Sequence, residues 1–330
     1  MRAFVKINID KPCHLGVKYY YLYILESDMY ILDMHCDSIG TVTSEHGLIN
    51  KYNFSREYGQ LQFVASFIPA GNDTPEVRRR KLMHYLDVYI AETNRLKLVP
   101  VTTCHDLNFA REFDKRASLI SIEGGGGLFA DSEELNILYR AGLRVLGLCW
   151  DTNELAASAW DKNDTGLTAE GVAMVKRCSE LGIILDVSHL SDNSFYGMLE
   201  TTAYPVVATH SNFRAVTDSP RNLTLDMARK IAARGGVIGL NLYPGFLSDS
   251  GRATKDDILR HVDYALENLG EDVLAFGFDI DGTDGAYPEG ITEDGSIHDQ
   301  VVDLLLSRYS ESVVEKIAYK NAVEFLKCNL

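Results

Sequence analysis

Short apolar runs alternate with longer amphipathic stretches along most of this chain, from about residue 30 onward. The runs are rich in Val, Ile and Leu, and most of them lack a regular polar alternation. Near-continuous apolar runs are typical of strands buried on both faces, as in parallel sheets covered by helices. The pattern predicts eight such strands, at residues 31–36, 61–68, 117–122, 145–150, 183–187, 206–208, 237–242 and 273–278.

The stretches between these runs carry signals for the start and the end of helices. Thr74-Pro75 begins a charged amphipathic stretch that reaches Lys97, with Thr as the N-cap and Pro at the first helical position. Other stretches begin with Ser or Thr, and several are followed by Gly, which commonly ends a helix. These signals predict further helices within residues 168–181, 191–200, 224–234 and 254–270.

Eight strands with intervening helices, over about 250 residues and without a linker-like segment, predict a (β/α)8 barrel, also called a TIM barrel. The alternative is a doubly wound open sheet, but no G-x-G-x-x-G follows the first strand. We expect one catalytic barrel domain over residues 29–330, which ends in C-terminal helices within residues 299–330. Residues 1–28 form an N-terminal extension that alternates like a small hairpin, unless Met29 is a second start codon.

Composition and charge exclude several classes of partner. Asp and Glu outnumber Lys and Arg by 47 to 32, a net charge of -15, which argues against a nucleic-acid partner. No run approaches the roughly 20 apolar residues of a membrane span. The six cysteines form no C-x-x-C pair and are interpreted as buried small hydrophobes in a reducing compartment. We therefore expect a cytoplasmic protein without membrane partners. Its oligomeric state is not determined by the sequence, and a homodimer is one possibility.

Histidines and carboxylates follow the predicted strands at the end where a barrel places its active site. Side chains two residues apart share one face of a strand, so Asp33, His35 and Asp37 point the same way. Residues from five strands would converge at this rim. The sequences at these strand ends are Asp33-Met34-His35-Cys36-Asp37, Ile122-Glu123-Gly124, Asp186-Val187-Ser188-His189, Thr209-His210-Ser211 and Asp279-Ile280-Asp281-Gly282.

Three histidines beside several carboxylates favour a metal site at this rim. One histidine at a strand end is more often structural, so the prediction depends on the joint pattern of His35, His189 and His210. Imidazole and carboxylate ligands without thiolate suit zinc or a similar divalent ion with open coordination positions. The remaining histidines are interpreted as solvated or structural, namely His14, His46, His84, His105, His261 and His298.

The same segments resemble the membrane (renal-type) dipeptidases, a family of zinc-dependent enzymes with an amidohydrolase-like barrel of the metal-dependent-hydrolase type. The resemblance runs from about Met29 to the C-terminus, and the order and spacing of the motifs make it specific. Besides the strand ends, it depends on the segments Gly182 to His189, Thr209 to Asn212, Ser219-Pro220-Arg221-Asn222 and Gly277 to Gly282.

The resemblance implies a binuclear zinc dipeptidase, which hydrolyses the peptide bond of small dipeptides by a metal-bridged hydroxide. By this resemblance His35 and Asp37 would hold the first zinc ion, and His189 and His210 the second. Glu123 would bridge the two ions. The cofactor expected is therefore Zn²⁺, with two ions per chain.

The resemblance also implies a catalytic carboxylate and three substrate-binding residues. Asp279 would lie near the metal-bound water, Arg221 would bind the substrate carboxylate, and Tyr243 would line the pocket. Better-known members have a histidine near the substrate carbonyl where this chain has Trp150, whose indole donates one hydrogen bond but cannot titrate.

Other interpretations remain open at this point. Trp150 leaves room for a related barrel hydrolase that acts on another amide or on a lactone, and a catalytically silent metal-binding protein is the third alternative. From the residues alone, Arg221 could equally pair with a nearby carboxylate such as Asp218 or Asp226.

Overall fold

The computed structural model of the chain describes residues 29–42, 59–292 and 296–330. All eight predicted strands are present in it and pair in parallel. The predicted hairpin within residues 1–28 lies outside the described residues. The strands are β1 (Ile31–Asp33), β2 (Gln60–Phe67), β4 (Ala117–Glu123), β5 (Val145–Gly147), β6 (Ile184–Asp186), β7 (Val206–Val207), β8 (Ile238–Leu240) and β9 (Leu274–Phe276).

The strands form a barrel in the order β7-β6-β5-β4-β2-β1-β9-β8. A parallel bridge between Ala208 and Ile238 joins the two ends of this order, and the backbone N–H of Ala208 donates to the oxygen of Val237 at 3.1 Å. The predicted (β/α)8 architecture is therefore confirmed. An additional strand, β3 (Val99–Pro100), pairs with β4 and was not predicted, because its second residue is proline, which is uncommon within strands.

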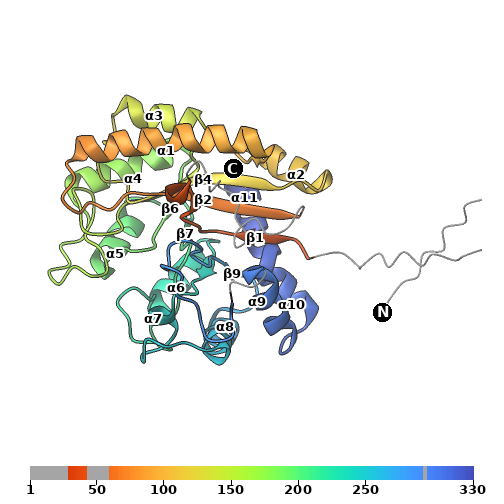
Figure 1. Cartoon of the computed structure of the whole chain (residues 1–330). Helices are drawn as coiled ribbons and strands as arrows, with labels where there is room; N and C mark the ends of the chain where they lie inside the picture. Colours follow the sequence, from red (N-terminus) through yellow and green to blue (C-terminus); the bar gives the residue numbers. More distant parts are fainter. Residues whose placement is uncertain (1–28, 43–58, 293–295) are drawn as a thin grey trace, which may run out of the picture.

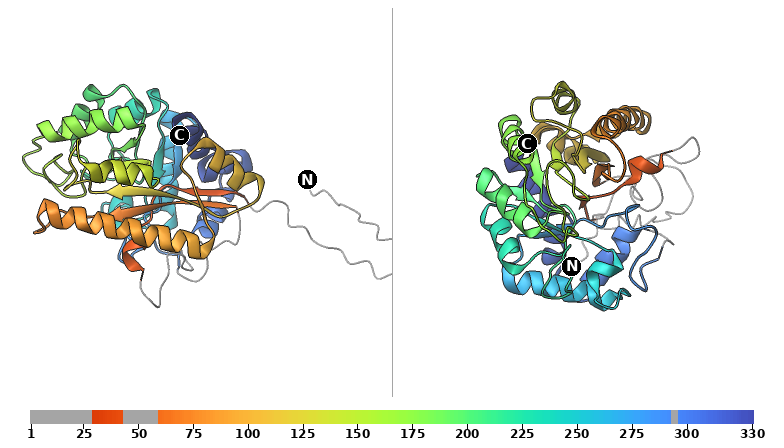
Figure 2. Two further views of the ribbon diagram at one scale, coloured as in Figure 1. Left: turned by 90° about the horizontal axis from the view of Figure 1, so that it is seen from above. Right: turned by 90° about the vertical axis from the view of Figure 1, so that its left-hand side faces the viewer.

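Helices cover the outside of the barrel, as Figures 1 and 2 show. The Oγ1 atom of Thr74 accepts from the N–H of Val77 at 3.4 Å at the start of the first helix, as predicted. The predicted C-terminal helices are also present, after β9 in the sequence. The helices are α1 (Pro75–Leu96), α2 (Cys104–Glu112), α3 (Glu133–Arg140), α4 (Ala169–Leu181), α5 (Asp192–Thr201), α6 (Leu225–Ala233), α7 (Pro244–Leu247), α8 (Lys255–Leu269), α9 (Ile297–Leu306), α10 (Glu311–Glu315) and α11 (Asn321–Asn329), with the 3₁₀-helix η1 (Ser38–Thr41) and the π-helical segment η2 (Lys316–Lys320).

Strand register decides which polar residues become neighbours at the rim. Phe67 at the end of β2 lies opposite Glu123 at the end of β4. Beyond β1 and β9, Cys36 forms a parallel bridge with Ile280, which brings the residues on either side of Cys36 next to Asp279. The right-hand view of Figure 2 looks toward this end of the barrel.

Fully buried apolar side chains fill the barrel and the layer beneath the helices, among them Phe63, Phe276 and Phe278. Each contributes on the order of 1.5–3 kcal/mol when it leaves water. Cys36, Cys149 and Cys178 are buried as interpreted. The interpretation is wrong for Cys328, which is exposed on the last helix, and for Cys104, which is half-buried, and Cys13 lies outside the described residues. Among the described residues, no helix has both the length and the apolar character needed to cross a bilayer.

Candidate metal centre

The structure brings the five predicted metal ligands together at the carboxyl ends of the strands. His35 and Asp37 follow β1, Glu123 ends β4, His189 follows β6, and His210 follows β7. All five side chains are at most 12% exposed, although they come from four separate strands. A barrel can bring them together because its parallel strands end at the same rim.

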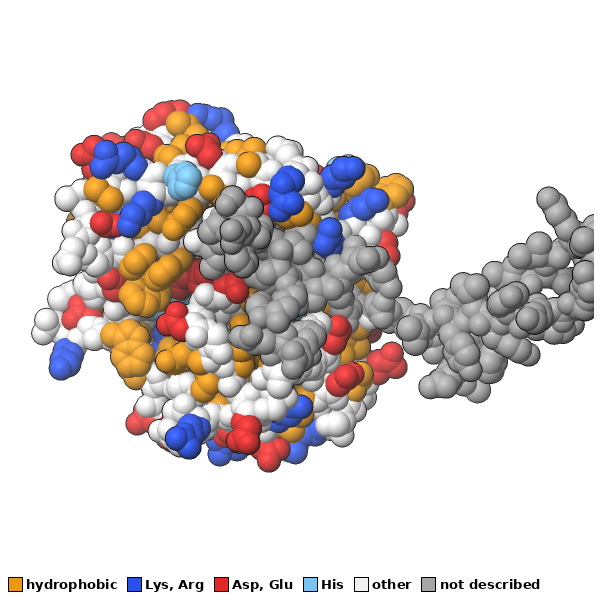
Figure 3. All heavy atoms as spheres, viewed as in Figure 1, with side chains coloured by type: hydrophobic (Ala, Val, Ile, Leu, Met, Phe, Trp, Pro, Cys, Tyr) orange, Lys and Arg blue, Asp and Glu red, His pale blue; other side chains and the backbone are white. Residues whose placement is uncertain are grey.

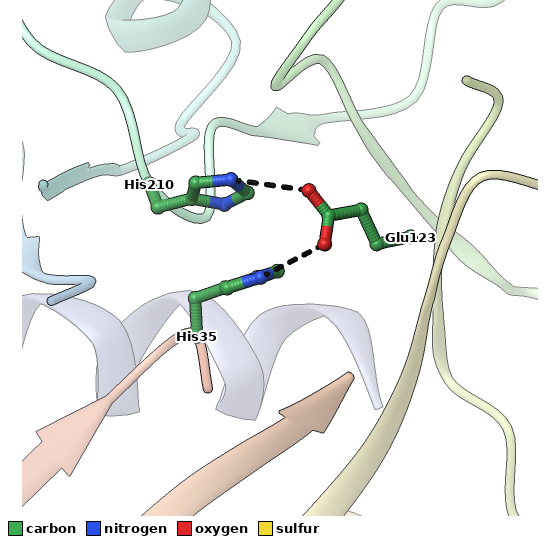
Figure 4. Close-up of side chains that lie close together, drawn as sticks. All are labelled: His35, Glu123 and His210. Atoms are coloured by element: carbon green, nitrogen blue, oxygen red, sulfur yellow. Dashed lines mark ion pairs between the residues drawn. The ribbon is translucent and has the colours of Figure 1, made fainter. Parts of the chain in front are cut away.

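Glu123 lies at the centre of the cluster, with histidines facing both of its oxygens (Figure 4). Its Oε2 atom lies 3.3 Å from Nε2 of His35. Its Oε1 atom lies 2.6 Å from Nε2 of His189 and 3.5 Å from Nε2 of His210. The carboxylate therefore lies between His35 on one side and His189 and His210 on the other.

The donor atoms of the cluster fit a metal ion. Two groups, His35 with Glu123 and His210, and His35 with Asp37 and Asp279, have ligand atoms within 4.8 Å of one another. Within the described residues, three buried atoms of these groups have no hydrogen-bond partner: Nε2 of His35, Oδ1 of Asp37 and Oε2 of Glu123. Buried polar atoms are usually satisfied, so three unsatisfied ligand atoms in one place favour a cation there.

The charge balance of the cluster supports the same conclusion. Burial lowers the pKa of His35, but the negative charges of Glu123 and Asp37 hold it well above its usual range. Burial raises the pKa of Asp37 to about 8 and also raises the pKa of Asp279. Burial lowers the pKa of His189 to about 4. These groups compete for protons, and a bound divalent cation would favour the deprotonated form of each.

Asp279 is held in an unusual backbone conformation, with φ at 62°. His189 shares this left-handed conformation, with φ at 68°. Such a conformation costs about 1–3 kcal/mol for a residue with a side chain and is often found at functional sites. The amide nitrogen of Asn241 donates to Oδ2 of Asp279 at 3.0 Å, which leaves Oδ1 directed toward His35 at 3.8 Å.

Gly282 keeps room for the two carboxylates of this side of the cluster. A Cβ atom at this position would overlap both Oδ1 of Asp279 and Oδ2 of Asp37. Only glycine therefore leaves both carboxylates in the place that the structure gives them.

Asp33 does not join the cluster, although the sequence places it on the same strand face as His35 and Asp37. Its Oδ1 atom accepts from the backbone N–H of His35 at 3.1 Å and from that of Phe278 at 3.0 Å. Its Oδ2 atom lies 2.8 Å from Nε2 of His298, and both side chains are fully buried. Asp33 therefore ties the ends of β1 and β9 together, and His298 is structural.

Arg221 is nearly fully buried beside the cluster, with 3% of its surface exposed. Its terminal nitrogens donate to Oγ of Ser211 at 2.7 Å and to the backbone oxygen of His210 at 2.9 Å. Its Nε donates to Nδ1 of His189 at 3.2 Å. Because that nitrogen of His189 accepts, its Nε2 carries the proton and donates to Glu123. For Nε2 to bind a metal, this proton must move to Nδ1, and Nδ1 can then no longer accept from Arg221.

The alternative pairing of Arg221 with Asp218 or Asp226 is not observed. In the described part of the chain no carboxylate forms an ion pair with Arg221, and Asp226 pairs with Lys230 instead. A buried guanidinium without a carboxylate partner is costly. An anionic group of a ligand would offset this cost.

Trp150 and Tyr243 lie at the rim, with 39% and 37% of their surfaces exposed. The ring of Trp150 lies 5.2 Å from that of Phe67, edge to face, and 6.2 Å from that of His189. The ring of Tyr243 lies 4.8 Å from that of Phe246. Figure 3 shows hydrophobic side chains, with acidic side chains beside them, on the left of the molecule. This is the side toward which the strand arrows point in Figure 1.

Sequence reasoning assigned no role to Asn241, Asp186 or Thr209, all of which support the cluster. Asn241 holds Asp279, and Asp186 bonds the hydroxyl of Thr209 beneath the histidines. The signal that could have found Asn241 is a buried polar residue that interrupts the apolar run 237–242.

A parallel (β/α)8 barrel with histidines and carboxylates clustered at its strand ends defines a metal-dependent hydrolase of the barrel type. The chain belongs to the membrane dipeptidase family (peptidase family M19), whose family model matches residues 24–328. The resemblance found in the sequence is thereby confirmed, and the chain is a metal-dependent peptide hydrolase.

Two curated relatives illustrate the range of the family. An uncharacterized protein in the pqqA 5′ region of Klebsiella pneumoniae is 34% identical over 233 residues, which cover 67% of this chain and 85% of that protein. Dipeptidase 3 of Homo sapiens is 30% identical over 235 residues, or 69% of this chain. The match covers 47% of dipeptidase 3, so the chain corresponds to about half the length of that relative.

Solved structures share the fold. A metallo peptidase from Rhodobacter sphaeroides, liganded with a phosphinate mimic of the dipeptide L-Ala-D-Ala, has a TM-score of 0.80 at 24% identity and covers 92% of this chain and 99% of its own. The probable dipeptidase PvdM from Pseudomonas aeruginosa has a TM-score of 0.70 at 19% identity and covers 81% of this chain and 85% of its own.

Proposed function

We propose that this chain is a binuclear zinc dipeptidase that hydrolyses the peptide bond of small dipeptides. The observation that supports it best is the position of Glu123, whose two oxygens face different histidines. His35 and Asp37 would hold one zinc ion, and His189 and His210 the other, with Glu123 between them. Two-metal hydrolases hold their ions about 3.5–4 Å apart, a spacing that a shared carboxylate can set.

The residues around the cluster would divide the work of hydrolysis. When bound, the zinc ions would polarise the scissile carbonyl and make the attacking water more acidic. Asp279 would accept the proton of that water through Oδ1, since Asn241 holds its Oδ2. It would then return the proton to the leaving amine. Burial raises the pKa of Asp279, which suits a carboxyl group that must both take and give a proton.

Arg221 would bind the terminal carboxylate of the substrate. Its contacts to Ser211 and His210 use one N–H on each terminal nitrogen. One N–H on each of these nitrogens has no partner among the described residues. Two such donors in a planar fork match the two oxygens of a carboxylate. Trp150 and Tyr243 would form the walls above the bond to be cleaved.

A substrate panel tests the proposed function. Zinc-loaded protein should hydrolyse unmodified dipeptides and should leave N-acylated amino-acid amides and simple lactones largely intact. Treatment with a chelator should remove the activity, and added zinc should restore it. Faster turnover of an amide or a lactone than of every dipeptide would instead favour the related barrel hydrolase that Trp150 leaves open.

A further inference from the structure

The hydroxyl of Thr209 lies at the centre of a buried hydrogen-bonded group beneath the metal cluster. Its Oγ1 atom lies 2.5 Å from Oδ2 of Asp186 and 2.8 Å from Nδ1 of His210. Nδ1 of His35 and Oγ of Ser188 follow, each at 3.4 Å. Thr209, Asp186, His35 and His210 are at most 3% exposed, so bulk solvent does not reach these contacts.

The directions of these hydrogen bonds follow from what each group can donate. Oδ1 of Asp186 accepts from the backbone N–H groups of Ser188 at 2.9 Å and Thr209 at 3.0 Å. Its Oδ2 atom accepts from the hydroxyl of Thr209, because a carboxylate has no proton to donate. A threonine hydroxyl has one proton, so Oγ1 of Thr209 can only accept from the imidazole beside it.

The proton of His210 must therefore be on Nδ1, which leaves the lone pair on Nε2. That nitrogen lies 2.9 Å from Nε2 of His189, which carries a proton, and 3.5 Å from Oε1 of Glu123, inside the cluster. The longer contact between Oγ1 of Thr209 and Nδ1 of His35 brings a second imidazole N–H to the same acceptor, with Nε2 of His35 facing Oε2 of Glu123.

We propose that Thr209, with its hydroxyl oriented by Asp186, is a positioning residue that fixes the tautomer of His210 so that Nε2 is ready to bind metal. The proposal rests on the proposed function, in which His210 is a metal ligand. A partner that fixes the ring and the tautomer of a metal-binding histidine typically changes metal affinity about 10–100-fold when it is mutated.

His189 offers an internal comparison, because it lacks such a hydroxyl. Its Nδ1 accepts from Arg221, so its proton is on Nε2, the opposite tautomer. Within one cluster, therefore, the partner of Nδ1 decides which ring nitrogen carries the proton. The role of Thr209 is therefore specific to the histidines whose Nδ1 faces its hydroxyl, His210 at 2.8 Å and His35 at 3.4 Å.

The test compares Thr209→Val, which keeps the shape but removes the hydroxyl, with Thr209→Ser, which keeps the hydroxyl. Zinc affinity is measured by competition with a chromogenic chelator, without reference to activity. We expect Thr209→Val to bind zinc about 10–100-fold more weakly and Thr209→Ser to stay within about threefold of the wild type. Equal affinities of wild type and Thr209→Val, or equal losses in both variants, would overturn the proposal.

A matched control is present in the same chain. Oγ1 of Thr217 lies 3.3 Å from Nε2 of the fully buried His261, which belongs to no candidate metal group. Thr217→Val makes the same chemical change at another threonine–histidine contact, so it reports the general cost of losing a buried hydroxyl. Its zinc affinity should match that of the wild type, and a loss as large as that of Thr209→Val would contradict the specific role.

A second readout needs no variant of Thr209. In metal-free wild-type protein with ¹⁵N-labelled histidine, the ring signals of His210 should be those of the tautomer with the proton on Nδ1. His210→Gln identifies these signals by their loss. A proton on Nε2 would overturn the proposal even if Thr209→Val failed to fold. If the wild type has the expected tautomer and zinc affinity but cleaves no dipeptide, the proposed function fails and the role of Thr209 remains.

Discussion

Replacement of Asp279 by asparagine should lower kcat for dipeptide hydrolysis by about 10²–10⁴-fold, the usual contribution of general acid–base catalysis. Asparagine has nearly the same shape but cannot take up a proton from water and return it to the leaving amine. Most of the bound metal should remain, because His35, Asp37 and Glu123 keep their donor atoms on that side of the cluster. Steady-state kinetics and elemental analysis of the same preparation check both expectations.

Two further variants separate catalysis from metal binding and from folding. Asp284→Asn is the matched control, since Asp284 follows the same strand, has φ at 52° and is exposed. This variant should be fully active. His210→Ala should lose metal and activity together. An Asp279→Asn enzyme with wild-type kcat would remove Asp279 from the mechanism.

Replacement of Arg221 by methionine should lower kcat/KM for an unmodified dipeptide by roughly 30- to 1000-fold, which corresponds to about 2–4 kcal/mol for a lost charge-assisted contact. The wild type should prefer the free dipeptide over its C-terminal amide by a similar factor, because the amide has only one oxygen and cannot accept both hydrogen bonds of the guanidinium. The variant should lose most of that preference. Arg221→Lys should recover little, since a point charge does not replace the planar fork.

The contact between Arg221 and His189 makes a control necessary, because the variant also removes a donor from a proposed metal ligand. Metal content and hydrolysis of the amidated dipeptide are therefore measured alongside. If Arg221 acts only by orienting His189, the free and amidated substrates should lose activity equally. A wild type that cleaves both forms equally well would contradict the assignment of the carboxylate site.

The barrel could be predicted because its strands are buried on both faces and therefore appear as apolar runs. The predicted strand at residues 145–150 shows the limit of this signal, since β5 ends at Gly147 and the rest of the run is a loop that leads to Trp150. The bridge between Ala208 and Ile238 that closes the ring depends on contacts remote in sequence, and no local pattern reports it.

The metal cluster could be predicted in outline because parallel strands end at one rim, so His35, Glu123 and His210 had to meet there. The contacts that support these side chains could not be predicted. The pairing of Asp33 with His298 joins residues 265 positions apart, and it gives a buried partner to a histidine that had no local signal. The tautomers of the histidines depend on the contacts of Nδ1 with Thr209 at 2.8 Å and with Arg221 at 3.2 Å, which only the folded chain sets.

A zinc titration of the metal-free enzyme, with bound zinc and dipeptide hydrolysis measured at every addition, tests the central claim most directly. Five candidate ligands exceed what one tetrahedral zinc ion needs. We therefore expect activity to rise until two zinc ions are bound per chain and to stay constant beyond that point. Full activity with one bound ion would contradict the binuclear centre, and dipeptide hydrolysis without any metal would contradict the account as a whole.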